Sequence, residues 1–213
     1  MANYLTIASQ SEAAFREKMS RFISFAIPVT TAEEAKEYVG LYANEYHDAR
    51  HVCWAYMIGS DRKEFLSSDN GEPSGTAGKP ILGQINSFGL TNIVIIVVRY
   101  FGGIKLGTSG LIAAYREAAR LAIEAAEIIE GKDMTTLSFT FPYLAMNDVM
   151  KLLKAQNPPG GREVIKIIEQ AFDNTCSITI SLPLDLLPEL SGRIGGISGT
   201  SILSATGAGE ADK

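Results

Sequence analysis

The sequence has few of the residues that build disulfide or membrane-spanning structures. Its two cysteines, Cys53 and Cys176, lie far apart among 213 residues. This spacing is typical of reduced thiols and excludes a disulfide framework. The longest aliphatic run, residues 93–98, has six residues, whereas a membrane helix needs about 20. The first residues also lack the basic, apolar and small-residue pattern of a signal peptide. We therefore expect a cytoplasmic protein.

Positive charge is scarce as well. The net charge is −5, with hydrophobic residues at 46% and charged residues at 20%. These fractions are ordinary for a globular protein, and the length allows one large domain or two small ones. No global field draws such a chain to nucleic acid or to acidic membranes. Any contact with nucleic acid must therefore use a local patch.

Residues 93–110 are the most informative stretch of the chain. The aliphatic run at 93–98 predicts a strand buried on both faces, and a helical pattern extends from about 108 to 129. Four glycines follow the aliphatic run: Gly102, Gly103 and Gly107 before the helical pattern, and Gly110 in its first turn. Glycine lets backbone N–H groups approach a ligand closely, and a helix N-terminus adds partial positive charge. The stretch predicts a site for a phosphate or carboxylate, unless the glycines only serve a tight turn with left-handed backbone angles. The expected anion-binding residues are Lys79, Arg99, Lys105, Gly107, Thr108, Ser109, Gly110 and, from a neighbouring segment, Arg50.

A second glycine-rich loop spans residues 68–78. It is superficially similar to a P-loop, but Pro80 stands where the magnesium-binding hydroxyl belongs and no buried strand precedes it. Nucleotide hydrolysis by that route is excluded. Asp69 and Glu72 could hold a metal ion, although such residues more often solvate a turn.

The segment 47–53 contains both histidines, His47 and His51, together with Cys53. Three such side chains suggest zinc, but a fourth ligand with suitable spacing is missing. Alternatively, His47, His51, Cys53 or Glu72 could supply proton or nucleophile chemistry. The simpler interpretation is a buried Cys53 in a strand, with the histidines hydrogen-bonded nearby. We therefore expect neither a metal nor a cofactor.

Basic and aromatic residues alternate at residues 15–22, where Arg16, Lys18 and Arg21 lie close to Phe15 and Phe22. Such a pattern can support RNA contact through stacking and phosphate pairing. At this net charge, a solvated strand face is the favoured interpretation.

The first half of the chain alternates strand and helix patterns. Residues 4–29 look extended, with a polar break at 10–14, and Thr31 with Glu34 forms a capping box before a helix. The pattern then gives a strand at 51–59, a charged turn at 60–64, a short helix near 80–88 and the strand at 92–99.

Beyond a boundary at 130–133 the predicted order is strand, helix, strand, strand, helix, strand. A Pro-Pro-Gly-Gly stop at 158–161 ends the first helix, and the runs 164–172 and 175–182 form a hairpin. This βαββαβ order is that of a ferredoxin-like sandwich. The tail from 207 to 213 is expected to fray. The fold class is thus α+β.

Several blocks together resemble the IMPACT family, and its bacterial YigZ-like branch in particular. They are KMSRFI at 18–23, HxxxHxCxAY at 47–56, SDNGEPSGTAGKPIL at 68–82 and VRYFGGIKLGT at 98–108. The last two are long and specific. The sequence departs from the family pattern at Asn70, usually acidic, at Ser109, usually glycine, and at Ala113, usually arginine.

The resemblance implies a ribosomal-protein-like α/β domain at 1–132 and a ferredoxin-like domain at 133–213, similar to one of elongation factor G. Eukaryotic relatives regulate translation through protein partners, and no catalytic activity is well established for the family. We expect a non-enzymatic regulator associated with translation, which binds RNA, the ribosome or a translation-related protein through the glycine-rich cleft. We do not expect it to bind a membrane. Binding to RNA should weaken steeply with salt.

The alternative is a hydrolase or transferase acting on a phosphorylated or carboxylated small molecule through the His/Cys segment. One arrangement favours a functional site of either kind: both glycine loops and the segment 47–53 should face a single cleft. The oligomeric state is left open.

Overall fold

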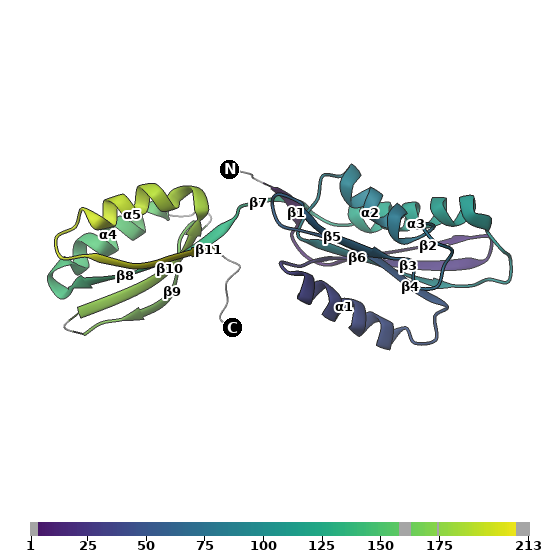
Figure 1. The fold of residues 1–213 in the computed structure, drawn as a ribbon, viewed down its shortest axis with the longest axis horizontal. Helices are drawn as coiled ribbons and strands as arrows, with labels where there is room; N and C mark the ends of the chain where they lie inside the picture. The colour runs from purple at the N-terminus through teal and green to yellow at the C-terminus, as the bar shows by residue number, and fades with distance from the viewer. Residues whose placement is uncertain (1–3, 158–162, 174, 208–213) are drawn as a thin grey trace. The chain divides into compact units, whose positions relative to one another are not determined.

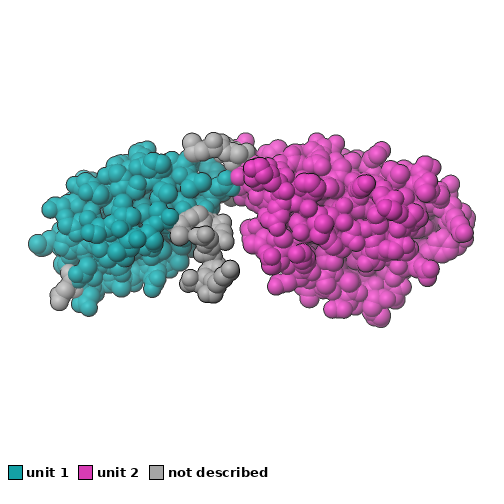
Figure 2. Space-filling model, in the orientation of Figure 1, with its two compact units in different colours: residues 1, 132–213 teal, residues 2–131 magenta. Residues whose placement is uncertain are grey.

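The computed structural model describes residues 4–157, 163–173 and 175–207. It divides into two compact units, residues 2–131 and residues 132–213, drawn in magenta and teal in Figure 2. We call them the N-terminal unit and the C-terminal unit. Among the described residues, no helix is long and apolar enough to cross a membrane.

A five-stranded antiparallel sheet forms the centre of the N-terminal unit, with strand order β2-β3-β6-β4-β5. Its central strand, β6, is the predicted aliphatic run, and its residues 93–98 are fully buried. A strand can bury both faces only if the sheet is covered on both sides. The strands are β2 (Ser11–Glu17), β3 (Ser20–Pro28), β4 (His51–Ile58), β5 (Glu64–Ser68) and β6 (Ile93–Tyr100); β1 (Tyr4–Ile7) pairs separately with β7 (Ile128–Gly131).

Helices cover both faces of this sheet (Figure 1). Helix α1 (Ala32–Glu45) packs on one face, and α2 (Gly78–Ser87) and α3 (Gly107–Glu124) pack on the other. Alternate residues of β6 therefore enter different cores: Ile95 and Val97 face α2 and α3, whereas Ile96 and Val98 face α1. Each such aliphatic side chain stabilises the unit by about 1.5–3 kcal/mol.

The capping box before α1 forms as expected. Thr31 Oγ1 accepts from the Glu34 N–H at 3.1 Å. The Glu34 carboxylate reaches one residue further back than predicted, because it accepts from the Thr30 N–H at 2.7 Å. The cap satisfies donors that the helix itself cannot pair.

Three element boundaries differ from the sequence prediction. The extended segment 4–29 breaks at 8–10 and turns sharply at Lys18 and Met19, whose φ angles of 44° and 67° are typical of a two-residue hairpin. Strand β5 was not predicted, because its residues Glu64–Ser68 lack an alternating pattern. Helix α3 ends at Glu124 rather than at residue 129, since residues 128–131 pair with β1 instead.

The C-terminal unit has the predicted element order. A four-stranded antiparallel sheet runs β11-β8-β10-β9, and the two helices pack on one face through Phe139, Ile178, Val149 and Leu190. Pro188 lies in the first turn of α5, where proline is tolerated. The predicted stop at 158–161 and all of the tail beyond Gly207 lie outside the described residues. The elements are β8 (Met134–Pro142), α4 (Met146–Gln156), β9 (Lys166–Ala171), β10 (Thr175–Pro183), α5 (Leu187–Gly195) and β11 (Ser201–Gly207), with short 3-10 turns at Tyr143–Ala145 and Leu184–Leu186.

Candidate functional site

A cleft of about 500 Å³ opens in the N-terminal unit where β6 ends and α3 begins. Both glycine loops contribute to it, through Glu72 and Gly107, and the His/Cys segment contributes His51. Segments distant in the sequence thus converge on one hollow. The lining residues are Arg50, His51, Glu72, Pro73, Arg99, Phe101, Lys105, Leu106, Gly107, Thr108 and Leu111.

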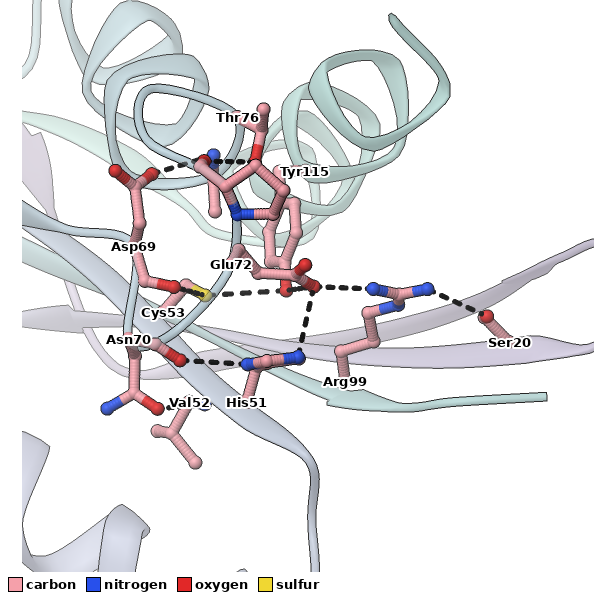
Figure 3. Close-up of polar contacts among 12 residues, drawn as sticks. Ser20, His51, Val52, Cys53, Asp69, Asn70, Glu72, Thr76, Arg99 and Tyr115 are labelled. Atoms are coloured by element: carbon pink, nitrogen blue, oxygen red, sulfur yellow. Dashed lines mark hydrogen bonds and ion pairs between the residues drawn. The ribbon is translucent and has the colours of Figure 1, made fainter. Parts of the chain in front are cut away.

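Arg99 forms the floor of this cleft and is 5% exposed. Its Nη1 donates to Glu72 Oε1 at 2.5 Å and its Nη2 lies 3.4 Å from Ser20 Oγ (Figure 3). Its Nε is buried and has no acceptor among the described residues. Arg99 was predicted as an anion contact, but its charge is already paired with the Glu72 carboxylate inside the protein.

Glu72 is the acceptor on which this network converges. The same Oε1 also accepts from the Tyr115 hydroxyl at 2.9 Å and lies 3.8 Å from His51 Nε2 (Figure 3). Both members of the Glu72–Arg99 pair are almost completely buried. A buried charge pair of this kind is costly to break, because either partner alone would be an uncompensated charge.

His51 is oriented by the neighbouring loop. Its Nδ1 donates to the Asn70 carbonyl oxygen at 2.8 Å, and the Asn70 side chain accepts from the Val52 N–H at 3.2 Å. The loop can turn back in this way because Asn70 and Gly71 adopt φ angles of 42° and 80°. His51 therefore presents Nε2 to Glu72 rather than to a metal.

Cys53 lies beneath the cleft rather than in it. Its thiol donates to the Asp69 carbonyl oxygen at 2.9 Å and lies 3.3 Å from the Tyr115 hydroxyl. Burial raises the pKa of Cys53 to about 12, despite the opposing effect of the Tyr115 hydrogen bond. A thiol in this state is a poor nucleophile. The geometry agrees with the simpler interpretation of a packed strand residue.

The glycine loop at 68–78 is sealed by its own carboxylate. Asp69 accepts from the backbone N–H groups of Gly75, Ala77 and Gly78 at 2.8 to 2.9 Å, which closes the N-terminus of α2. Burial would raise the pKa of Asp69, but these three hydrogen bonds outweigh it and hold the pKa below its usual value. These N–H groups are therefore already paired and do not bind an external anion in this arrangement.

The N-terminus of α3 lacks such a seal. Its N-cap residue is Leu106, whose aliphatic side chain offers no acceptor. Gly103 and Gly107 have φ angles of 87° and 73°, with no atom within 4 Å of an added Cβ at either position. The glycines therefore serve a left-handed turn, and the turn also leaves the helix end open to the cleft. Position 102 requires glycine for a different reason, because a Cβ there would lie 2.1 Å from the backbone of Met19.

Arg50 and Lys105 are the exposed cations of the cleft. No ion pair found within the described residues involves either side chain. With Arg99 they set three positive charges against the single carboxylate of Glu72. The cleft is thus locally cationic on an acidic protein.

Three of the expected anion-binding residues lie elsewhere. Lys79 lines a different hollow between α2 and α3, together with Arg116. Ser109 and Gly110 belong to the first turn of α3 but do not line the cleft. His47, a catalytic candidate, is exposed, and its Nδ1 contacts the Asn44 carbonyl oxygen at 3.2 Å.

Phe101 lines the cleft although the sequence pattern did not predict it there. Its ring is 49% exposed and the Arg99 guanidinium lies 5.7 Å from its centroid. Phe101 also borders a second hollow of about 670 Å³, which shares Arg50 and His51 with the cleft. Its position directly after a strand and before two glycines was the available signal. By contrast, Phe22 is fully buried and stacked on Phe15, so the pattern at 15–22 offers no exposed stacking platform.

The described residues also bear on the metal ion that the segment 47–53 suggested. Within residues 4–157, 163–173 and 175–207, no group of three or more His, Cys, Asp or Glu side chains is placed to hold an ion. The side chains at 47–53 do not form a cluster, because each contacts a different backbone carbonyl oxygen: His47 that of Asn44, His51 that of Asn70 and Cys53 that of Asp69.

Comparison with known proteins identifies the lineage. Residues 18–123 match the model of the Impact N-terminal domain. The Haemophilus influenzae protein called IMPACT family member is 40% identical over 186 residues, which is 85% of this chain and 86% of that protein. This chain belongs to the IMPACT family. The IMPACT family member YigZ of Escherichia coli is 32% identical over 95% of this chain and 97% of its own length.

A solved structure also resembles this IMPACT family chain over nearly its whole length. Described as the crystal structure of a hypothetical protein, it has a TM-score of 0.72 and 31% sequence identity, and the match covers 96% of this chain and 98% of that one. The two-unit architecture is therefore shared with a relative.

Proposed function

We propose that this protein is a non-enzymatic regulator associated with translation and that it binds RNA, as free RNA or in the ribosome, through the cleft at the start of α3. One observation carries the proposal: the open helix end lies in a cleft with the exposed cations Arg50 and Lys105. Backbone N–H groups and a few cations hold phosphate oxygens without a basic protein overall.

The buried guanidinium of Arg99 supports an anion at this place. Its Nε–H has no acceptor in the described part of the chain, and its charge is only balanced by one carboxylate that also serves Tyr115. An anion in the cleft would therefore meet the exposed cations Arg50 and Lys105 above an Arg99–Glu72 pair that adds no net negative charge. Membership of the IMPACT family supports the link to translation, since the eukaryotic branch acts there.

The alternative hydrolase or transferase has less support. His51 and Glu72 do line the cleft together, but Cys53 lies below it with a raised pKa. We therefore propose that His51, Glu72 and Cys53 have a structural role at the floor of the cleft. We also propose that the N-terminal domain is ribosomal-protein-like and that the protein is cytoplasmic. We propose further that the C-terminal domain is ferredoxin-like and related to one in elongation factor G, which the strand order β11-β8-β10-β9 supports.

Two matched lysines test the cleft. Lys105→Gln removes an exposed cation beside the open end of α3, whereas Lys79→Gln removes one beside the sealed end of α2. We expect Lys105→Gln to weaken binding of a fluorescent single-stranded RNA about threefold to tenfold, and Lys79→Gln to leave it unchanged. Fluorescence anisotropy at low salt measures both, and co-sedimentation with purified bacterial ribosomes provides the second assay.

The salt dependence of RNA binding provides a second measurement of the same contacts. Two exposed cations give a slope of log affinity against log salt of about −1.4 for a single strand. This slope is shallower than the sequence alone suggested. Absence of RNA binding and of co-sedimentation at low salt, or equal losses in both lysine variants, would contradict the proposal.

A further inference from the structure

We propose that the cleft and its neighbouring hollow together bind an unpaired nucleotide, with the phosphate at the start of α3 and the base stacked on Phe101. This inference rests on the proposed function and specifies its ligand. The two hollows adjoin each other, because Arg50, His51 and Phe101 line both of them. These three residues form a ridge that a single strand can cross.

Phe101 has the properties of a stacking platform. Phe101 is 49% exposed, although it belongs to a segment that is held in place on both sides. Before it, Arg99 is fixed in the Glu72 network; after it, Gly102 packs directly against the Met19 backbone. The ring is therefore prepositioned, so little conformational entropy is lost when a base stacks on it. The guanidinium of Arg99 supports the ring through a cation–π contact with its centroid 5.7 Å away.

The second hollow can pair with the polar edge of a base. Asn70 uses its side-chain oxygen to accept from the Val52 N–H, which leaves its amide nitrogen to act as a donor. Asp48 accepts from the Tyr100 hydroxyl at 2.8 Å and still has lone pairs for other donors. Both residues line the hollow beside Phe101. An aromatic surface bordered by donors and acceptors suits a nucleobase better than an aliphatic side chain.

The charge of the cleft and the need for an unpaired base restrict the class of RNA that can bind. Only an unpaired base can expose its face to a protein ring, because bases within a duplex are already stacked and paired. The two exposed cations, Arg50 and Lys105, suffice for one or two phosphates, and the net charge of −5 disfavours a longer track. We therefore expect a short unpaired segment, such as a loop or an end, rather than a duplex.

An abasic probe separates stacking from phosphate binding. The protein is titrated against a ten-nucleotide oligouridylate and against an abasic oligomer with the same number of phosphates. We expect the oligouridylate to bind about tenfold more tightly, because base stacking on an aromatic residue adds to the phosphate term. A duplex RNA of equal length should bind no better than the abasic oligomer.

Phe101→Leu provides the matching variant, with Phe65→Leu as its control. Phe65 is 54% exposed on β5 and lines neither hollow. Phe101→Leu should remove most of the tenfold advantage and leave affinity for the abasic oligomer unchanged, whereas Phe65→Leu should change neither. Trp54 fluorescence, from the single tryptophan of the chain, reports whether each variant is folded.

Each other outcome has a distinct meaning. Equal binding of oligouridylate and abasic oligomer overturns the stacking site but leaves the phosphate cleft intact. Binding of neither overturns both proposals. If a hexa-aspartate peptide competes as well as the oligouridylate, the ridge is a site for acidic peptides and the nucleotide proposal is wrong.

Discussion

The two glycine loops of the N-terminal unit lead into helices in opposite ways. At α2 the first backbone N–H groups are taken by Asp69, which lies nine residues before the helix begins. At α3 the N-cap is Leu106, and the helix end opens to a cleft with Arg50 and Lys105. Similar sequence signatures therefore produce one sealed and one open helix end.

This difference shows what a glycine-rich turn before a helix can and cannot predict. Glycine permits the left-handed angles at both loops, at Gly75 and at Gly107. Whether the helix end then binds a ligand depends on whether a carboxylate of the loop takes its N–H groups, as Asp69 does at α2. The glycine pattern alone does not reveal that competition, because it depends on how the loop folds back to bring Asp69 against the helix end.

The largest expected effect comes from the residue that links the two loops. Glu72 lies in the first loop but pairs with Arg99 at the floor of the second. We expect Glu72→Ala to lower the free energy of unfolding by about 3–5 kcal/mol, because it leaves Arg99 buried and uncompensated. Urea denaturation followed by Trp54 fluorescence measures it in the N-terminal unit. A loss below about 1 kcal/mol would mean that the pair is not a structural link.

The next largest effect is expected from removing the Asp69 carboxylate that caps α2. Asp69→Ala removes the acceptor of three backbone N–H groups, and we expect it to destabilise the N-terminal unit by about 2–3 kcal/mol. The folded pKa of Asp69 is lowered, so its contribution is fully present above the unfolded pKa of about 4 and is lost as pH falls through the folded value.

The acid dependence distinguishes charge from shape at this cap. Asp69→Asn keeps the size of the side chain but cannot titrate. Its stability between pH 2 and pH 5 should therefore vary less than that of the unmodified protein, as measured by denaturation at a series of pH values. An identical pH profile would assign the acid sensitivity to other carboxylates.

A smaller effect compares the two turns directly. Gly75→Ala and Gly107→Ala each place a side chain at a positive φ angle, 76° and 73°, where L-residues are strained. We expect each to destabilise by about 1 kcal/mol in thermal unfolding. Only Gly107→Ala should also weaken RNA binding, since it alters the open helix end. Equal effects on binding would remove the distinction between the two loops.

The residues of the chain determined the elements of the fold more completely than their ends. Uninterrupted aliphatics at 93–98 predicted the doubly covered strand, and the period of α3 predicted its buried face, with Tyr115 and Ala118 in the core. The end of α3 and the existence of β5 were not predictable, because pairing partners distant in sequence decided them. Residues 128 and 129 were predicted as helix but belong to β7, which pairs with β1.

For the candidate site, the sequence by itself determined which chemical groups are available: two glycine loops, a few cations and a His/Cys segment. Tertiary structure alone decided their states. It buried Arg99 against Glu72, withdrew Cys53 from solvent, sealed α2 with Asp69 and left α3 open beside Phe101. The physical reason is that desolvation and hydrogen-bond competition depend on neighbours in space, whereas sequence gives only neighbours along the chain.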